Sequence, residues 1–282
     1  MENRGVAGRG RLCAAVRAGV VVLAFAAGRA VAGEAHYRGG IGLALFLAPA
    51  YPASDSERFF VYPYPYWDYE SPVLHLHHEH LRAKWAPDSP LSFGLGANGS
   101  PPAAAGSPAA RAGMPALLPT FAIGPDVMYA LAWHPGGLRT ALGARVRYRF
   151  AVDSSFRITG VGTSASGFVE WHSPRGRTWP IVISLGPVFR SRGVNDYFFG
   201  VQAPYATAGR PAYGAPGGYA GVRLTGAIST RMGPIDIAFF ARYRNYRGAV
   251  FAASPLMKAS NTVIVGTAVV WVFLRSRSQG GA

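Results

Sequence analysis

The side chains best suited to hold a metal ion lie in one short run of histidines. The run reads HLHHEH and extends from His75 to His80. Successive side chains of a strand point to opposite faces, so His75, His77 and Glu79 would share one face. Imidazole nitrogens together with a carboxylate can bind Zn²⁺. The same residues also suit a polar strand end at an aqueous rim. We favour this second interpretation, which predicts no metal and no other cofactor.

A second set of candidate residues consists of arginines that alternate with apolar side chains, as in the run ARVRYRF at 144–150. Rings of arginine can make a pore selective for anions. Alternatively, internal arginines can pair with acids such as Glu170 and Asp236 and fill the inside of a barrel. Both interpretations place the guanidinium groups inside a lumen. The candidate lumen-lining residues are Arg145, Arg147, Arg149, Arg223, Arg242 and Arg244.

The pattern needed for nucleophilic catalysis does not occur in the sequence. Such catalysis needs a serine activated by a nearby histidine. His172 and Ser173 are neighbours, but adjacent residues of a strand face opposite ways. The sequence has no G-x-S-x-G motif and no P-loop, and we assign its many glycines to turns and barrel kinks rather than to a dinucleotide-binding site. We therefore predict that the protein is not an enzyme and has no catalytic residues.

The elements that would position these residues are β-strands, because apolar side chains recur at every second position. Near the end of the chain, Val263, Val265, Val269 and Trp271 share one face. Pro, Gly, Asp and Ser clusters separate the alternating runs and mark turns. The expected strands are 37–47, 58–69, 72–83, 90–97, 125–134, 138–151, 155–172, 178–190, 195–203, 219–230, 235–245 and 261–273.

The alternation favours a membrane barrel over a soluble sandwich. The polar positions hold arginines and glycines in mid-strand, several strands reach ten or more residues, and tyrosines crowd 62–69. The longest apolar runs have about a dozen residues, below the ~18 of a membrane helix. Only helices and closed barrels satisfy the backbone in lipid. We predict an all-β protein, a closed antiparallel transmembrane β-barrel of about 12 strands, or alternatively 10, over residues 33–273.

The first 32 residues have the composition of a signal peptide. Four arginines precede the apolar stretch at 18–27, and Ala30-Val31-Ala32 supplies an A-x-A cleavage site. Removing five Arg and one Glu lowers the formal net charge from +15 to about +11. The remaining basic residues are scattered rather than clustered, which argues against nucleic acid as a partner. We predict export to the outer membrane of a Gram-negative cell envelope.

Three stretches of the chain have recognisable motifs; they begin at GIGLALFLAPAYPASDSERFF, at DYFFGVQAPYATAGRPAYGAPGG and at ARYRNYRGAVFAASPL. Together these stretches resemble the MltA-interacting protein (MipA)/OmpV family of outer-membrane proteins. Ala53 stands where the family usually has Gly, and Ala252-Ala253 where an Asp commonly precedes the Ser-Pro. The matching positions include Pro49, Tyr51, Ser54, Asp55, Pro65, Tyr66, Asp68, Tyr69, Tyr197, Phe199, Gly200, Tyr213, Gly218, Ser254 and Pro255.

The resemblance implies a scaffold that links a lytic murein transglycosylase to a murein synthase in peptidoglycan metabolism. A small-solute or anion-conducting channel is the alternative. Outer-membrane lipid and lipopolysaccharide are expected partners, through basic residues of the outer rim such as Arg175, Arg177 and Arg210.

The sequence does not assign a role to two segments. The Ala-, Pro- and Gly-rich segment 98–120 falls on the periplasmic side in the twelve-strand count, where short turns are expected. The polar tail 274–282 follows the aromatic Phe273.

Overall fold

The computed structural model describes residues 36–70, 74–77, 80–84, 86, 88–103, 109–131, 137–174 and 176–276. Side chains are not described at 74–77, 80–82 and 84. The expected signal peptide at 1–32 and the tail beyond Ser276 lie outside the described residues.

The described chain is built from antiparallel β-strands, which confirms the all-β part of the prediction. Ten strands have ten or more residues: β1 (His36–Pro49), β2 (Glu57–Glu70), β5 (Leu91–Ser100), β6 (Thr120–Ala130), β7 (Arg139–Val152), β8 (Ile158–His172), β9 (Ile181–Arg190), β10 (Gly218–Met232), β11 (Ile235–Asn245) and β12 (Asn261–Arg275). Two shorter strands, β3 (Leu74–His77) and β4 (His80–Lys84), complete the sheet. The helical elements are α2 (Arg192–Phe199), η1 (Ala109–Arg111) and η3 (Ala203–Tyr205).

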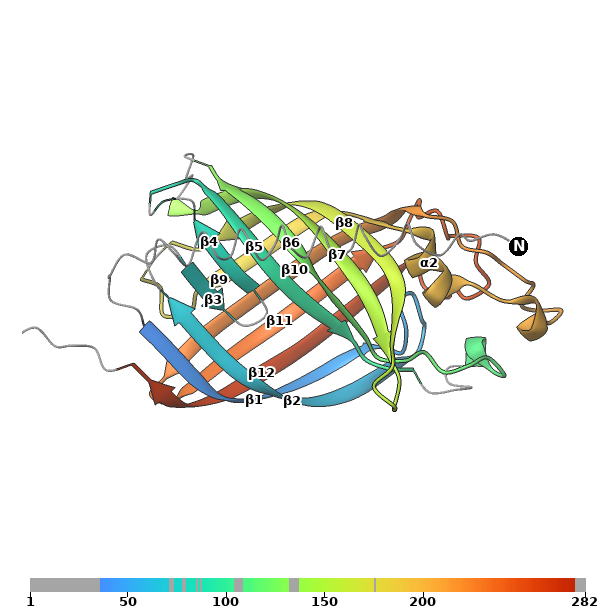
Figure 1. Cartoon of the computed structure of the whole chain (residues 1–282), viewed down its shortest axis with the longest axis horizontal. Helices are drawn as coiled ribbons and strands as arrows, with labels where there is room; N and C mark the ends of the chain where they lie inside the picture. Colours follow the sequence, from blue (N-terminus) through green and yellow to red (C-terminus); the bar gives the residue numbers. More distant parts are fainter. Residues whose placement is uncertain are drawn as a thin grey trace, which may run out of the picture.

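Each strand pairs with its neighbours in the sequence, and β1 pairs with β12 as well as with β2. The strand order therefore returns to its start and forms a closed barrel. The first residues of β1 and the last residues of β12 lie at one end, because Arg38 is paired with Arg275. In Figure 1 this end is on the left, and α2 lies at the opposite end.

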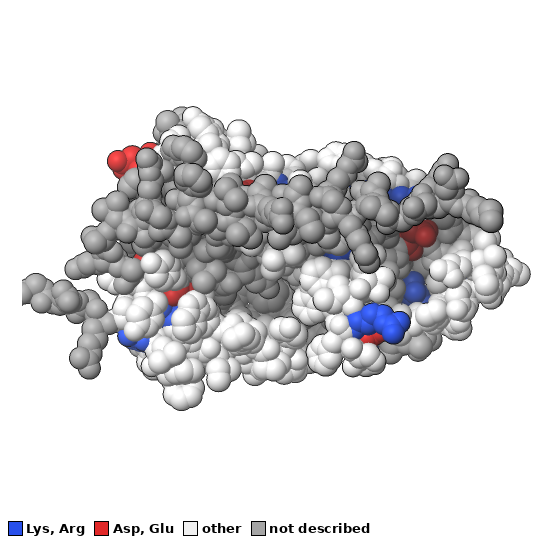
Figure 2. All heavy atoms as spheres, in the orientation of Figure 1, with Lys and Arg blue, Asp and Glu red and all other residues white. Residues whose placement is uncertain are grey.

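The burial pattern of the barrel is the reverse of that in a soluble sheet. On β7, the outward-facing Leu142 and Val146 are 48% and 49% exposed, while the inward-facing Arg147 is 3% exposed. Asp126 on β6 is likewise buried, at 5% exposed. Figure 2 shows that the described part of this outer face carries few charged groups. The apolar side chains therefore face outward and much of the charge faces inward.

The segment expected as one strand at 72–83 instead forms β3 and β4, which pair with each other. This extra reversal moves the connection between β5 and β6 to the end opposite β1's first residue. The described part of the segment 98–120 is therefore not at the end where the strand count placed it. Its Ala- and Pro-rich composition does not have to fit a short turn there.

The expected strand at 195–203 is wrong, because its first residues belong to α2. Val194, Asn195, Phe198 and Phe199 are the buried residues of this helix. Their spacing follows the helical period and places them on one side. The run of aromatic and β-branched residues suited a strand equally well, and packing against the barrel end decides the outcome. Among the described residues, no helix combines the length and the apolar character needed to cross a bilayer.

Candidate functional site

One end of the barrel is covered by a packed layer of loops, called the cap here. The cap consists of the β1–β2, β9–β10 and β11–β12 connections and the described parts of the β5–β6 connection, that is 50–56, 191–217, 246–260, 101–103 and 109–119. Their buried apolar side chains form a single cluster. At its centre the rings of Phe199 and Phe251, both fully buried, stack at 3.9 Å. The cap is therefore a hydrophobic core in its own right, outside the barrel wall (Figure 1).

Hydrogen bonds tie the first connection of the cap to the last. The hydroxyl of Tyr51 donates to the carbonyl of Leu256 at 2.7 Å. The carbonyl of Ala53 accepts from the backbone N–H groups of Lys258 and Ala259, at 3.0 and 2.9 Å. These bonds join residues about two hundred positions apart in the chain. The family-motif position Tyr51 is thus a structural residue of the cap.

The structure gives a physical reason for alanine at position 53, where the family usually has glycine. Its backbone has φ 63°, in the left-handed region that favours glycine. Its side chain is fully buried in the cap. The methyl group therefore gains burial at a position where the backbone conformation would suit glycine better.

The helix α2 is held in the cap by its neighbours. Ser254 donates its hydroxyl to the carbonyl of Phe199 at 2.7 Å. Tyr197 donates to the carbonyl of Leu118, in the β5–β6 connection, at 3.0 Å. The segment 98–120, whose role was open, thus contributes directly to the cap.

The other motif positions of this set lie in or beside the cap. Tyr213 forms a backbone bridge with Val201, and Gly218 begins β10 with φ 142°. Ser54 is buried and Asp55 is exposed. Pro49, Gly200 and Pro255 occupy the end of β1, the C-terminus of α2 and the β11–β12 connection.

The cap contains a buried cation beside a neutral phenol. The guanidinium carbon of Arg111 lies 6.0 Å from the centre of the Tyr51 ring. Burial raises the pKa of the Tyr51 hydroxyl to about 12, and the positive charge of Arg111 opposes this rise. Burial also lowers the pKa of Arg111. The phenol therefore stays protonated through the physiological range and can donate its hydrogen bond.

The motif positions of β2 lie at the other end of the barrel. Tyr66 is buried and faces inward, within 3.4 Å of carboxylate oxygens of both Asp68 and Asp236. Asp236 also receives two bonds from the guanidinium of Arg38, at 2.7 and 2.8 Å. A cavity of about 60 Å³ adjoins Tyr66 and Asp236. Pro65 is exposed and Tyr69 half-buried on the same strand. Asp236 thus pairs with Arg38 rather than with a predicted lumen arginine.

Arg147 has a structural role that the sequence pattern does not show. Pro125 has no N–H, and the β6–β7 register omits residues 124–125. The Nη1 of Arg147 donates to the carbonyls of Gly124, Pro125 and Val146, at 2.7, 2.8 and 3.1 Å. Its Nη2 lies 3.1 Å from Asp126. Arg147 therefore replaces the missing ladder bonds and is not available to a passing solute.

The other two candidate arginines of β7, Arg145 and Arg149, also contact the protein interior. The guanidinium of Arg145 lies 3.8 Å from the centre of the Phe168 ring. Arg149 donates to the hydroxyl of Thr120 at 2.6 Å and to the amide oxygen of Asn98 at 3.3 Å. Both are half-buried on the inward face, as the alternation predicts.

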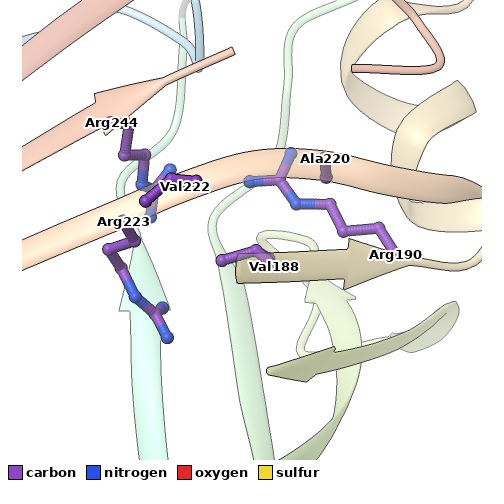
Figure 3. A pocket seen from close by; sticks show the side chains of 6 residues that line it. All are labelled: Val188, Arg190, Ala220, Val222, Arg223 and Arg244. Carbon is purple, nitrogen blue, oxygen red and sulfur yellow. The ribbon is translucent and has the colours of Figure 1, made fainter. Parts of the chain in front are cut away.

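The remaining candidates lie on the inward face of β10 and β11. Arg223 is paired directly with Arg244, and Arg242 with Thr225. Arg190, at the end of β9, adjoins Arg223 and Arg244 but was not among the predicted residues. It shares the inward parity of Val188, and this period of two is the signal that identifies it. Figure 3 shows Arg190, Arg223 and Arg244 around the cavity that they line; Arg190 and Arg244 extend toward Val222, and Arg223 extends away from it.

The acid Glu170 faces the lumen from β8 and is 7% exposed. Its Oε1 lies 2.8 Å from Nε2 of His172, two residues further along the same strand. The histidine side chains at 75 and 77 and the whole of Glu79 lie outside the described residues. Within the described part of the chain, no group of three metal-binding side chains occurs.

The basic residues expected at one outer rim lie at opposite ends. Arg177 belongs to the β8–β9 turn, at the end that carries the chain termini, whereas Arg210 belongs to the cap. The guanidinium of Arg210 donates to the carbonyls of Tyr205, Ala110 and Ala112. The expectation of a shared rim is therefore wrong for this pair, and Arg175 lies outside the described residues.

The arrangement has two chemical capacities. The interior presents several guanidinium groups, which attract and bind anions. The cap closes the end of the barrel above them with a packed apolar core. Among the described residues, the opposite half of the barrel has only two smaller buried clusters, of Tyr66 with Val270 and Val272 and of Met128 with Ala141 and Phe168. Exposed side chains at that end include Met232 and Leu274.

Comparisons with known proteins place these features in context. The family model described as MltA-interacting protein MipA matches residues 41–273. No curated protein sequence matches the chain. Among solved structures, the NanC porin is similar at 8% sequence identity, with 86% of this chain and 100% of that chain covered and a TM-score of 0.35. The outer membrane protease OmpT from Escherichia coli is similar at 7% identity, with 85% and 96% covered and a TM-score of 0.32. The CymD monoaromatic hydrocarbon channel is similar at 9% identity, with 85% and 89% covered and a TM-score of 0.34.

Proposed function

The chain belongs to the MltA-interacting protein MipA family, and from this membership we propose that it is a non-enzymatic scaffold of the outer membrane. In this role it brings a lytic murein transglycosylase together with a murein synthase. The family match over residues 41–273 is the observation that carries the proposal. The printed family name itself refers to interaction with MltA.

The membrane location rests on the reversed burial of the barrel. A face that exposes Val146 by 49% beside a 3% exposed Arg147 suits a wall in contact with lipid. Replacing water by hydrocarbon around an apolar side chain lowers the free energy by about 25 cal/mol per Å² of its apolar surface. We propose that the closed barrel spans the outer membrane with its ten long strands, because β3 and β4, of four and five residues, are shorter than the ~9–11 residues of a crossing strand.

The orientation follows from the two ends of the barrel. We place the end with His36 and Arg275 in the periplasm, because bacterial barrels of this kind keep both termini there. The cap then lies outside the cell. Murein enzymes act in the periplasm, so their docking surface would be the termini end.

Two exposed apolar side chains make this end a testable docking surface. Met232, beside the two-residue β10–β11 turn, is 54% exposed, and Leu274, near the end of β12, is 46% exposed. A few well-packed side chains near the centre of an interface commonly account for most of its binding free energy. Phe156 at the opposite end is 85% exposed and provides a matched control.

The experiment is retention of a purified lytic murein transglycosylase by the detergent-solubilised barrel. We expect the unmodified protein to retain the enzyme, Met232→Asp with Leu274→Asp to lose at least tenfold in affinity, and Phe156→Asp to leave it unchanged. Heat-modifiable mobility on gels verifies that each variant is folded. Absence of retention by the unmodified protein would refute the scaffold.

The arginines of the interior favour one alternative function, an anion-conducting channel. The cap opposes it, because its apolar cluster covers one mouth of the barrel. Planar-bilayer recordings separate the two functions. The scaffold predicts no steady conductance, whereas the channel predicts conductance with a preference for anions over cations.

A further inference from the structure

A small cavity lies against the inner wall of the barrel, next to the cap. Its lining consists of Val188, Arg190, Ala220, Val222, Arg223 and Arg244. Ala220 also belongs to the apolar cluster of the cap, so the cavity sits where the cap meets the barrel. Its volume is about 20 Å³, which exceeds the ~10–15 Å³ that one water molecule needs.

Three guanidinium groups from three different strands border this cavity. Arg190 comes from β9, Arg223 from β10 and Arg244 from β11. Arg223 and Arg244 are direct partners across the β10–β11 ladder. Like charges placed opposite each other destabilise a strand pair. The fold therefore holds positive charge together at a place where it repels itself.

No described carboxylate forms an ion pair with these three arginines. The polar partner of Arg223 is the hydroxyl of Ser166, at 3.3 Å. The Nη1 atom of Arg190 is buried and has no hydrogen-bond partner. A buried guanidinium N–H without an acceptor costs on the order of 1–3 kcal/mol or more. An anion would satisfy this donor and reduce the repulsion at the same time.

The side chains are directed so that one ligand could contact two of them. Figure 3 shows the guanidinium of Arg190 extending from β9 toward Val222. The side chain of Arg244 approaches Val222 from the other side, and Arg223 extends away from β10. Arg190 and Arg244 therefore present N–H donors to the cavity from the two sides of Val222.

We infer that this cavity is a binding site for a carboxylate group, held between Arg190 and Arg244 with Arg223 contributing charge. A planar guanidinium matches the two oxygens of a carboxylate in a bidentate arrangement. A cavity of about 20 Å³ accepts a group of this size more readily than a tetrahedral phosphate with four oxygens. The site does not depend on the scaffold role, because it lies inside a capped barrel.

The test is binding of ¹³C-formate to the full chain in detergent at low chloride, followed by ligand-observed NMR. We expect one saturable formate site per chain and at least tenfold weaker binding of inorganic phosphate. Competition by glucuronate distinguishes the source of the group. Displacement of formate by glucuronate identifies the carboxylate end of a larger solute, whereas binding of formate alone identifies a small free carboxylate, and both results support the site.

Arg190→Gln is the deciding variant, and we expect it to weaken formate binding at least tenfold, as the loss of a charged hydrogen bond implies. Arg247→Gln removes the same charge from an exposed position of the cap and should leave binding unchanged. Val188→Ile keeps all three arginines and narrows the cavity, so it should also weaken binding. It serves as the test if Arg190→Gln fails to fold. Absence of saturable formate binding, equal binding by a folded Arg190→Gln variant or by Val188→Ile, or tighter binding of phosphate would overturn the inference.

Discussion

Replacing Arg147 by methionine should destabilise the barrel more than replacing any exposed arginine. Methionine keeps much of the length and apolar contact of the side chain but removes all of its N–H donors. The substitution would leave the carbonyls of Gly124, Pro125 and Val146 without the donor they have now. It would also remove the ion pair between Arg147 and Asp126, whose side chains are 3% and 2% exposed, respectively.

The magnitude follows from these four interactions. A hydrogen bond to a charged group contributes about 1.5–3 kcal/mol, and breaking a buried ion pair costs about 3–5 kcal/mol. The four bonds are not independent, because one guanidinium makes them all and water can replace some of them. We therefore expect Arg147→Met to lower the free energy of unfolding by about 3–5 kcal/mol.

The assay is reversible guanidinium unfolding in detergent micelles, followed by tryptophan fluorescence, with gel mobility as a check of folding. Arg157→Met, at an exposed position of the β7–β8 connection, is the matched control and should change stability by less than about 0.5 kcal/mol. The double variant Arg147→Met with Asp126→Leu should lose less than the sum of the single variants. A loss below about 1 kcal/mol in Arg147→Met would refute the assigned role.

Three further predictions concern the cap. Phe199→Ala removes a fully buried ring stacked on Phe251 and should lower the stability of the cap by about 3–5 kcal/mol. We expect faster trypsin cleavage at Lys258, while the barrel keeps its gel mobility. Ala53→Gly should change stability by less than about 1 kcal/mol, because relief of the left-handed backbone offsets the lost methyl burial, whereas Ala53→Val should cost more than about 2 kcal/mol in the same denaturant titration. Burial holds the pKa of Tyr51 at about 12 in the folded cap, so its contribution is complete below the unfolded pKa near 10 and is lost as the pH rises toward about 12. Near-ultraviolet circular dichroism from pH 9 to 12 should show this loss, and Tyr51→Phe should remove that part of the pH dependence.

The period of two predicted the architecture because each strand alternates between two contrasting environments. In the run 144–149, only one assignment places the apolar side chains on one face and the arginines on the other. The errors occurred where this contrast is absent. The run around Phe198 and Phe199 is apolar on consecutive positions, so a strand and a short helix fit it equally. Only packing in the cap, which joins loops distant in sequence, distinguishes the two.

The candidate arginines were predictable as a set, but their roles were not. Parity places Arg147 and Arg223 on the inward face in the same way. Their different roles depend on neighbours from other strands: Arg147 faces the interrupted ladder at Pro125, whereas Arg223 faces Arg244. Such pairings depend on the register between strands, which a single sequence does not specify. The metal interpretation of His75, His77 and Glu79 stays a prediction, because those side chains lie outside the described residues.

The junction between β1 and β12 is stabilised by two side-chain contacts in addition to its backbone ladder. At the capped end the bond from Tyr51 to Leu256 spans it, and at the other end Arg38 reaches across β12 to Asp236 on β11. A lipid or solute could leave the barrel laterally between β1 and β12 only if both side-chain contacts broke together with the backbone ladder. Lateral gating at this junction is thus disfavoured. Each of the two side-chain contacts can form only after the first and last strands have met during membrane insertion.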